Sequence, residues 1–204
     1  MFREHLSALI KRELGLSICA EADNIQDAMR LIRETKPDVA IVDITLRGSS
    51  GLELIKDLKA QNSDLKVLVL SMHDEDLYAE RSLRAGAWGY ISKNEASKEV
   101  IKAIRCVLAG QVYVSHEMNA KLLSRITRKS TPTQLAGMET LADRELEVFQ
   151  LLGRGKGTKE IADRLNLGES TVETYRARIK DKLNLRSAAE LYLRAGEWVR
   201  EHGA

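Results

Sequence analysis

The chain has 204 residues, of which 44% are hydrophobic and 30% are charged, and its formal net charge is +2. This balance is typical of a soluble globular protein. No apolar run is long enough to span a bilayer and no basic, apolar leader opens the sequence, so we expect a cytoplasmic protein without membrane contact. Net charge alone indicates no partner, although the small excess of cations lies wholly after residue 127.

The cysteines and histidines predict neither a disulfide nor a metal centre. Cys19 and Cys106 lie far apart, in apolar surroundings and without CxxC spacing, which predicts two buried thiols. The four histidines are equally scattered, so no metal site of His and Cys is expected.

The first half of the chain alternates amphipathic helical patterns with short β-branched runs, which is typical of βαβ units. It opens with a helical pattern over residues 2–14, whose apolar side predicts a helix that covers a sheet. An α/β fold, with a parallel sheet between helices, is therefore predicted for residues 17–104. The expected strands are 17–22, 39–43, 66–71 and 89–91, and the expected helices that follow them are 26–35, 51–60, 74–85 and 97–109.

Three polar residues occupy the carboxyl ends of these strands, where doubly wound sheets gather functional groups. Asp43 ends one apolar strand and opens the loop 44–50, Ser71 ends the next, and Lys93 follows the last. A carboxylate there can act as a nucleophile towards a phosphoryl donor, while a hydroxyl and an ammonium group hold the phosphoryl oxygens. Taken singly, Asp and Ser are also common turn residues, so the functional interpretation depends on their joint placement.

The pattern changes after Gly110, where helices alone are predicted. A helix is expected over residues 116–126, and the polar residues 127–134, which include Pro132, predict a linker. An all-α module follows. Ala142 precedes its first helix without a hydroxyl, so Asp143 is the expected cap. The four predicted helices span residues 143–152, 159–165, 170–183 and 187–199.

The second and third helices of this module predict a helix-turn-helix. A short helix, residues 159–165, and a turn containing Gly168 precede a basic helix, residues 170–183, which is the second helix of the motif. Ser170 and Glu173 have the spacing of a capping box, which sets the predicted start of the second helix. Five cations lie between residues 176 and 186, and such a density suits the phosphates of duplex DNA. A solvated helix in a bundle that serves only assembly is the alternative. The predicted inward residues are Val172, Ile179 and Leu183, with Tyr175 beside them, and the predicted outward residues are Glu173, Thr174, Ala177 and Lys180.

These features resemble a two-component response regulator of the NarL/FixJ type. The resemblance lies in Asp43, Ser71, Tyr90 and Lys93, followed by the linker, residues 141–145 and the helix-turn-helix, and it covers essentially the whole chain. It implies three parts: a flavodoxin-like receiver of doubly wound parallel sheet in residues 1–110, a helix and linker in residues 111–138, and a LuxR-type helix-turn-helix DNA-binding domain in residues 139–204.

The resemblance also implies partners and residue roles. The protein is expected to be a transcription regulator of a phosphorelay and not an enzyme, phosphorylated by a sensor histidine kinase and bound to double-stranded DNA as a homodimer. Asp43 is the expected phosphoacceptor, Ser71, Tyr90 and Lys93 form the expected switch, and Asp43 and the backbone carbonyl of Thr45 are the expected Mg²⁺ ligands. The expected DNA-binding residues are Lys159, Ser170, Thr171, Glu173, Thr174, Arg176, Ala177, Arg178, Lys180 and Lys182.

One departure from this family leaves two hypotheses open. Its receivers begin with a strand that ends in two acidic residues, which hold Mg²⁺, whereas this sequence opens at the following helix. Asp43 alone would leave most positions of an octahedral Mg²⁺ to water. Either Met1 is an internal methionine of a longer protein, or the receiver is a variant that is not phosphorylated and serves only in dimerisation or protein binding.

A nucleotide-dependent enzyme is the least favoured alternative. Residues 153–158 superficially resemble a phosphate-binding loop, but Gly157 stands where Ser or Thr must follow the lysine, and no strand is predicted before it.

Overall fold

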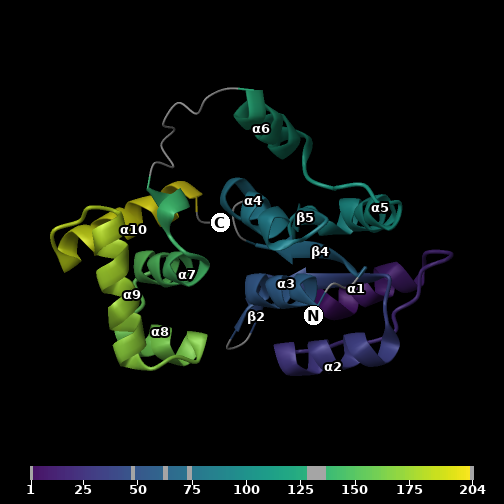
Figure 1. Ribbon diagram of the computed structural model, residues 1–204, viewed down its shortest axis with the longest axis horizontal. Coiled ribbons are helices and arrows are strands. Elements are labelled where there is room, and N and C mark those ends of the chain that lie inside the picture. Colours follow the sequence, from purple (N-terminus) through teal and green to yellow (C-terminus); the bar gives the residue numbers. More distant parts are fainter. Residues whose placement is uncertain (1, 47–48, 62–63, 73–74, 128–136, 203–204) are drawn as a thin grey trace. The chain divides into compact units, whose positions relative to one another are not determined.

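A small parallel sheet and a bundle of short helices form two separate units, Met1–Leu122 and Leu123–Ala204 (Figure 1). The structure is a computed structural model and describes residues 2–46, 49–61, 64–72, 75–127 and 137–202. Within those ranges no helix is long and apolar enough to cross a membrane. The predicted linker lies outside them, apart from its first residue.

Three of the four predicted strands are present. Strand β4 (Lys66–Ser71) lies in the middle, parallel to β1 (Val39–Asp43) on one side and to β5 (Gly89–Ser92) on the other. Because the register pairs Asp43 with Leu70 and Ser71 with Ser92, the three strands end at the same edge of the sheet. Burial extends over nearly all of β4, as expected for a parallel strand that is covered on both faces.

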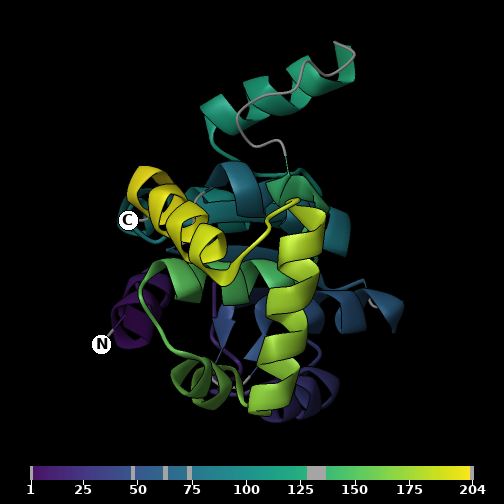
Figure 2. The same cartoon turned by 90° about the vertical axis from the view of Figure 1, so that its left-hand side faces the viewer.

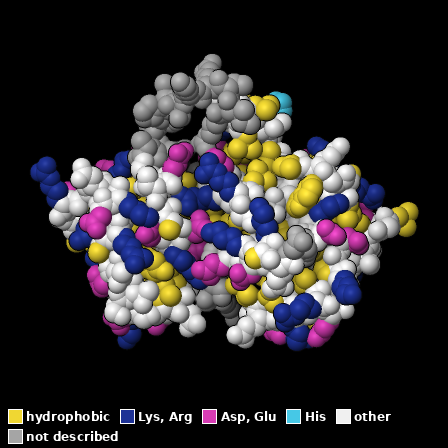
Figure 3. All heavy atoms as spheres, in the orientation of Figure 1, with side chains coloured by type: hydrophobic (Ala, Val, Ile, Leu, Met, Phe, Trp, Pro, Cys, Tyr) yellow, Lys and Arg dark blue, Asp and Glu magenta, His cyan; other side chains and the backbone are white. Residues whose placement is uncertain are grey.

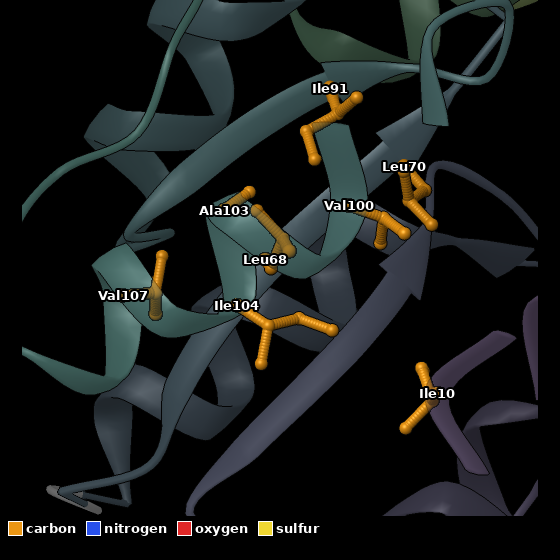
Figure 4. Close-up of a cluster of buried hydrophobic side chains, with 8 residues drawn as sticks. All are labelled: Ile10, Leu68, Leu70, Ile91, Val100, Ala103, Ile104 and Val107. Atoms are coloured by element: carbon orange, nitrogen blue, oxygen red, sulfur yellow. The ribbon is translucent and has the colours of Figure 1, made fainter. Parts of the chain in front are cut away.

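Helices cover the sheet and confirm the α/β fold. Val67 and Val69 point away from Leu68 and Leu70, because side chains alternate along a strand, and all four are buried. The face of Leu68 and Leu70 packs against α1 and α5 (Figure 4). The helices of this unit are α1 (Phe2–Lys11), α2 (Ile25–Thr35), α3 (Gly51–Ala60), α4 (Glu75–Ala85) and α5 (Ala96–Leu108). The cluster drawn in Figure 4 consists of Ile10, Leu68, Leu70, Ile91, Val100, Ala103, Ile104 and Val107.

Residues 17–22 do not form the predicted strand. Among the described residues, β1 pairs with β4 alone, and no strand lies at its other edge. A strand is held by the backbone groups of its neighbour, so an apolar run that has no neighbour does not enter a ladder. Cys19 lies in this segment and is exposed, so its predicted burial is wrong because the strand does not form. Cys106 is half-buried.

The loop after Asp43 contains a small hairpin that the sequence did not predict. Strands β2 (Thr45–Leu46) and β3 (Ser49–Ser50) pair in the antiparallel direction. The residues between them, 47 and 48, lie outside the described ranges. The backbone N–H of Gly51 donates to the carbonyl of Ile44 over 2.8 Å, which closes the hairpin onto the start of α3.

The four predicted helices of the C-terminal module are confirmed (Figure 2), and they surround a second core of buried side chains. Its centre includes Phe149 and Trp198, whose ring centroids lie 6.1 Å apart in an edge-to-face arrangement. Helix α6 (His116–Thr127) and a short 3₁₀ turn, η1 (Met138–Thr140), precede this core. The module's helices are α7 (Asp143–Gly153), α8 (Thr158–Leu165), α9 (Glu169–Lys182) and α10 (Ala188–His202).

Helices α7 and α10 approach so closely that only glycine fits at one position. A Cβ atom built on Gly153 would lie 2.2 Å from the carbonyl oxygen of Ala195, which is backbone and cannot rotate away. Gly196, on the same helix as Ala195, has no described atom within 4 Å of such a Cβ.

We expect Gly153→Ala to lower the free energy of unfolding of the C-terminal unit by about 1–3 kcal/mol, as overpacking does. Gly196→Ala is the matched control. It should be neutral or stabilise by up to about 1 kcal/mol, because glycine is a poor helix former. Urea unfolding, followed by Trp198 fluorescence in a Trp88→Phe background, measures both. Equal stability of the two variants would contradict the close crossing.

Candidate functional site

The carboxyl edge of the sheet brings Asp43 and Lys93 into direct contact. Asp43 is the last residue of β1, and Lys93 directly follows β5. The ammonium of Lys93 forms an ion pair with Oδ2 of Asp43, and the backbone N–H of Thr45 donates to Oδ1 over 3.1 Å. The side chain of Asp43 is 30% exposed and that of Lys93 is 17% exposed, so the pair is only partly open to solvent.

Ser71 and Tyr90, on the neighbouring strands β4 and β5, are buried. Ser71 ends β4, and its carbonyl accepts a hydrogen bond of 2.8 Å from the backbone N–H of Lys93. Tyr90 lies on β5 opposite Val69. The strand ends thus bring Asp43, Ser71 and Lys93 to one edge of the sheet, where Asp43 and Lys93 reach the surface, whereas Tyr90 lies further back along β5.

Phe2 is a neighbour of the site that the sequence did not indicate. Its ring centroid lies 5.1 Å from Nζ of Lys93, within the range of a cation–π contact. The helical pattern predicts that Phe2 covers a sheet face, and no short-range signal links it to a lysine 91 positions later. The first turn of α1 therefore lies beside the Asp43–Lys93 pair.

The described residues at this edge do not by themselves fit a Mg²⁺ ion. Octahedral Mg²⁺ prefers hard oxygen ligands. Of the predicted ligands, the carboxylate of Asp43 is already engaged by Lys93 and by Thr45. No group of three or more His, Cys, Asp or Glu suited to a metal occurs within the described ranges.

The absence of a side chain at Gly51 allows the backbone of α3 to approach Asp43 closely. A Cβ atom at this position would lie 2.2 Å from the carbonyl oxygen of Asp43, so the start of α3 can approach the end of β1 only without a side chain.

Replacing Gly51 with alanine should therefore displace the backbone at Asp43 and weaken the ion pair with Lys93. We expect a loss of about 1–3 kcal/mol in the stability of the N-terminal unit. Urea unfolding followed by Trp88 fluorescence in a Trp198→Phe background measures it. Unchanged stability would show that the hairpin adapts to the added methyl group.

In the C-terminal unit, α8 and α9 form the predicted helix-turn-helix, but its second helix begins differently. Asn166 takes the left-handed conformation that ends α8, with φ of 54°, and Gly168 is the N-cap of α9. The capping box of Ser170 and Glu173 is thus wrong, because the helix starts before Ser170 and the carboxylate of Glu173 binds elsewhere. No side chain in the described ranges caps α9.

Glu173 instead joins the two helices of the motif. Its Oε1 accepts hydrogen bonds from the hydroxyl of Thr158 over 2.7 Å and from Arg176 over 2.6 Å, and Arg176 also donates to the Thr158 hydroxyl over 2.9 Å. The Arg176 guanidinium lies 5.3 Å from the ring centroid of Tyr192 on α10. The hydrogen bond from Thr158 and the positive charge of Arg176 lower the pKa of Glu173.

Two of the predicted DNA-binding cations are engaged within the module. Arg176 is 15% exposed and belongs to the contacts just described. Lys182 forms an ion pair of 2.6 Å with buried Glu145, which also accepts the backbone N–H of Ala142 over 2.7 Å. Glu145 therefore caps α7, and the predicted cap, Asp143, is wrong.

The outer side of α9 forms an open surface, which we call the recognition face. Its exposed members are Ser170, Thr171, Glu173, Thr174, Ala177 and Arg178. Four of them, with half-buried Tyr175, line a shallow hollow: Ser170, Thr171, Thr174 and Arg178. In Figure 2 α9 lies on the side of its unit that faces the viewer.

Charge alone does not mark the C-terminal unit. In Figure 3, Lys and Arg are interspersed with Asp and Glu over the visible side of the unit. Lys159, Arg178 and Lys180 are the predicted cations that make no hydrogen bond or ion pair with described residues, and Lys159 and Arg178 are exposed.

A parallel sheet with a carboxylate–lysine pair at its carboxyl edge, followed by a helix-turn-helix, is the combination expected of a receiver joined to a DNA-binding domain. Residues 1–105 match the response regulator receiver domain, and residues 139–195 match the luxR family of bacterial regulatory proteins. The chain therefore belongs to the response regulators with a LuxR-type helix-turn-helix. It is a DNA-binding transcriptional regulator of a two-component system and not an enzyme.

Relatives match along most of their length. Response regulator GacA of Pseudomonas aeruginosa is 36% identical over 182 residues, which are 89% of this chain and 84% of GacA. Response regulator UvrY of Escherichia coli K12 is 32% identical over 192 residues, 94% of this chain and 87% of UvrY.

Solved structures share the fold. A two-component response regulator of the LuxR family from Aurantimonas sp. SI85-9A1 is 32% identical and covers 62% of this chain and 90% of its own, with a TM-score of 0.57. The RcsB response regulator of Salmonella typhimurium, at 20% identity, covers 96% of this chain and 91% of its own with a TM-score of 0.68, and it supports the fold alone.

Proposed function

We propose that the N-terminal unit is a receiver in which Asp43 accepts a phosphoryl group, and that this event controls DNA binding by the C-terminal unit. The observation that carries the proposal is the contact between Asp43 and Lys93 at the carboxyl edge of the sheet. A partly exposed carboxylate can attack a phosphoryl donor, and a lysine beside it can pair with the added phosphoryl oxygens. Ser71 and Tyr90 are the proposed switch residues, together with Lys93.

The donor in this proposal is a sensor histidine kinase, the partner that a response regulator implies. The proposed receiver spans residues 1–110, the connecting helix and linker span residues 111–138, and the DNA-binding domain spans residues 139–204. We further propose a cytoplasmic protein that binds DNA as a homodimer, because helix-turn-helix dimers match operators of two-fold symmetry. Receiver domains typically bind Mg²⁺, but the proposal routes no step through the ion, because the described residues do not fit it.

Incubation with acetyl phosphate tests the phosphoacceptor directly. We expect the intact mass of the chain to rise by one phosphoryl group, because the Asp43 carboxylate becomes an acyl phosphate. The Asp43→Asn variant should gain none, and hydroxylamine, which attacks the acyl carbon, should release inorganic phosphate and leave a hydroxamate in place of the Asp43 carboxylate. A wild-type mass that does not change, with and without Mg²⁺, would contradict the proposal.

That result would favour a second candidate: a DNA-binding regulator that works without phosphorylation and whose receiver serves only in dimerisation or protein binding. Both oxygens of Asp43 already have protein partners, Lys93 and Thr45, which supports this candidate. Under it, Asp43→Asn and wild type should bind the same duplex equally before and after treatment with acetyl phosphate.

For DNA contact, we propose that the recognition face of α9 enters the major groove while Lys159, Arg178 and Lys180 pair with phosphates. Residues at the N-terminal end of the second helix contact base edges in this motif. Arg176 and Lys182, which are engaged inside the module, are proposed to act on DNA only indirectly.

Arg178→Ala should weaken binding to every duplex and reduce the slope of log K against log salt by about 0.9, because one phosphate contact is lost. Thr174→Val should change the preference among sequences and leave the slope unchanged. Arg33→Ala, which removes an exposed arginine from α2, is the control and should alter neither. Fluorescence anisotropy over a salt series measures all three. An unchanged slope for Arg178→Ala would exclude its phosphate contact.

A further inference from the structure

An acidic side chain stands on a recognition face that otherwise offers hydroxyls, alanine and arginine. Glu173 is 54% exposed and lies one helical turn from Ser170 and Ala177. A carboxylate beside a duplex is repelled by the phosphates, so general affinity for DNA does not account for its place. A contact with a base is favourable for a carboxylate, because the edges of bases carry hydrogen-bond donors.

The carboxylate of Glu173 is held in one orientation. Its Oε1 accepts two hydrogen bonds, one from the hydroxyl of Thr158 on α8 and one from the guanidinium of Arg176 on α9. Arg176 is itself fixed between the Thr158 hydroxyl and the Tyr192 ring. No described residue donates a hydrogen bond to Oε2. One oxygen is therefore anchored, while the other has an open acceptor position on an exposed side chain.

We propose that Glu173 recognises cytosine in the major groove, with Oε2 accepting a hydrogen bond from the N4 amino group. The inference rests on the proposed placement of α9 in the groove. Carboxylates accept from this amino group, since the major-groove edge of cytosine presents a donor and no acceptor of its own. Adenine is disfavoured because its N6 donor lies between two acceptors, its own N7 and O4 of the paired thymine.

Thr158 and Arg176 act as positioning residues in this scheme. They do not touch the base, but they fix the carboxylate that does. Removal of the Thr158 hydroxyl should therefore relax the choice at one base pair, a result that a purely structural contact between α8 and α9 would not produce. Thr158→Ser keeps the hydroxyl and should keep the preference.

Selection from random duplexes by the full-length protein tests the inference. Wild type should favour one C·G pair per half-site by about tenfold, and Glu173→Gln should lose that preference while keeping those at other positions. Thr158→Val should relax the same position. Glu169→Gln is the matched control, because it removes an exposed carboxylate from the first turn of the same helix, and it should select as wild type does.

A change on the DNA side tests the same contact without altering the protein. N4-methylcytosine still pairs with guanine but replaces the amino hydrogen that faces the groove. It should weaken wild-type binding about tenfold, and it should not weaken binding by Glu173→Ala. Selection by Glu173→Gln that matches wild type at every position would overturn the inference and leave DNA binding intact. Failure of wild type to bind any duplex would overturn the proposed DNA contacts as well.

Discussion

The parallel pairing of β1, β4 and β5 is the constraint on which the N-terminal unit depends. Alternate residues of β4 are buried on opposite faces, so a shift of one residue in its pairing would exchange the side chains that pack against the helices on the two faces. The register that avoids this ends all three strands at one edge. Asp43 and Lys93 are 50 positions apart, yet their contact follows from this register and from the backbone hydrogen bond between Lys93 and Ser71.

This dependence explains how much of the N-terminal unit the sequence predicts. Three strands are apolar runs whose neighbours are also present, so their positions follow from local pattern. Residues 17–22 have the same pattern, but a strand also needs a partner, and local sequence carries no information on whether the partner is there. Gly51 is a similar case. Its role is the 2.2 Å approach to Asp43, which depends on the tertiary path of the hairpin.

The helix-turn-helix was predicted more completely because nearly all of its signals are local. Glycine at the turn and the periodicity of the apolar residues lie within one short segment. Val172 and Ile179 are buried as predicted, whereas Leu183, also predicted to point inward, is half-buried. The errors came from side chains with two available partners. Glu173 has the spacing of a capping box, yet an arginine one turn later and a threonine on α8 attract it more strongly than a backbone N–H does. A hydrogen bond to a charged donor is stronger than a neutral one, so the observed choice is the expected one once α8 is in place.

The same competition changes the interpretation of the basic segment. Counting cations from 176 to 186 predicts affinity for DNA but treats every charge as available. Arg176 and Lys182 instead neutralise Glu173 and buried Glu145, so their charges stabilise the module and add little to its outer field. Fewer free cations mean fewer displaced counterions and a weaker salt-dependent attraction to any duplex. In the proposed complex, base edges therefore supply a larger share of the binding affinity, and on α9 the groups proposed to contact them are hydroxyls and one anchored carboxylate.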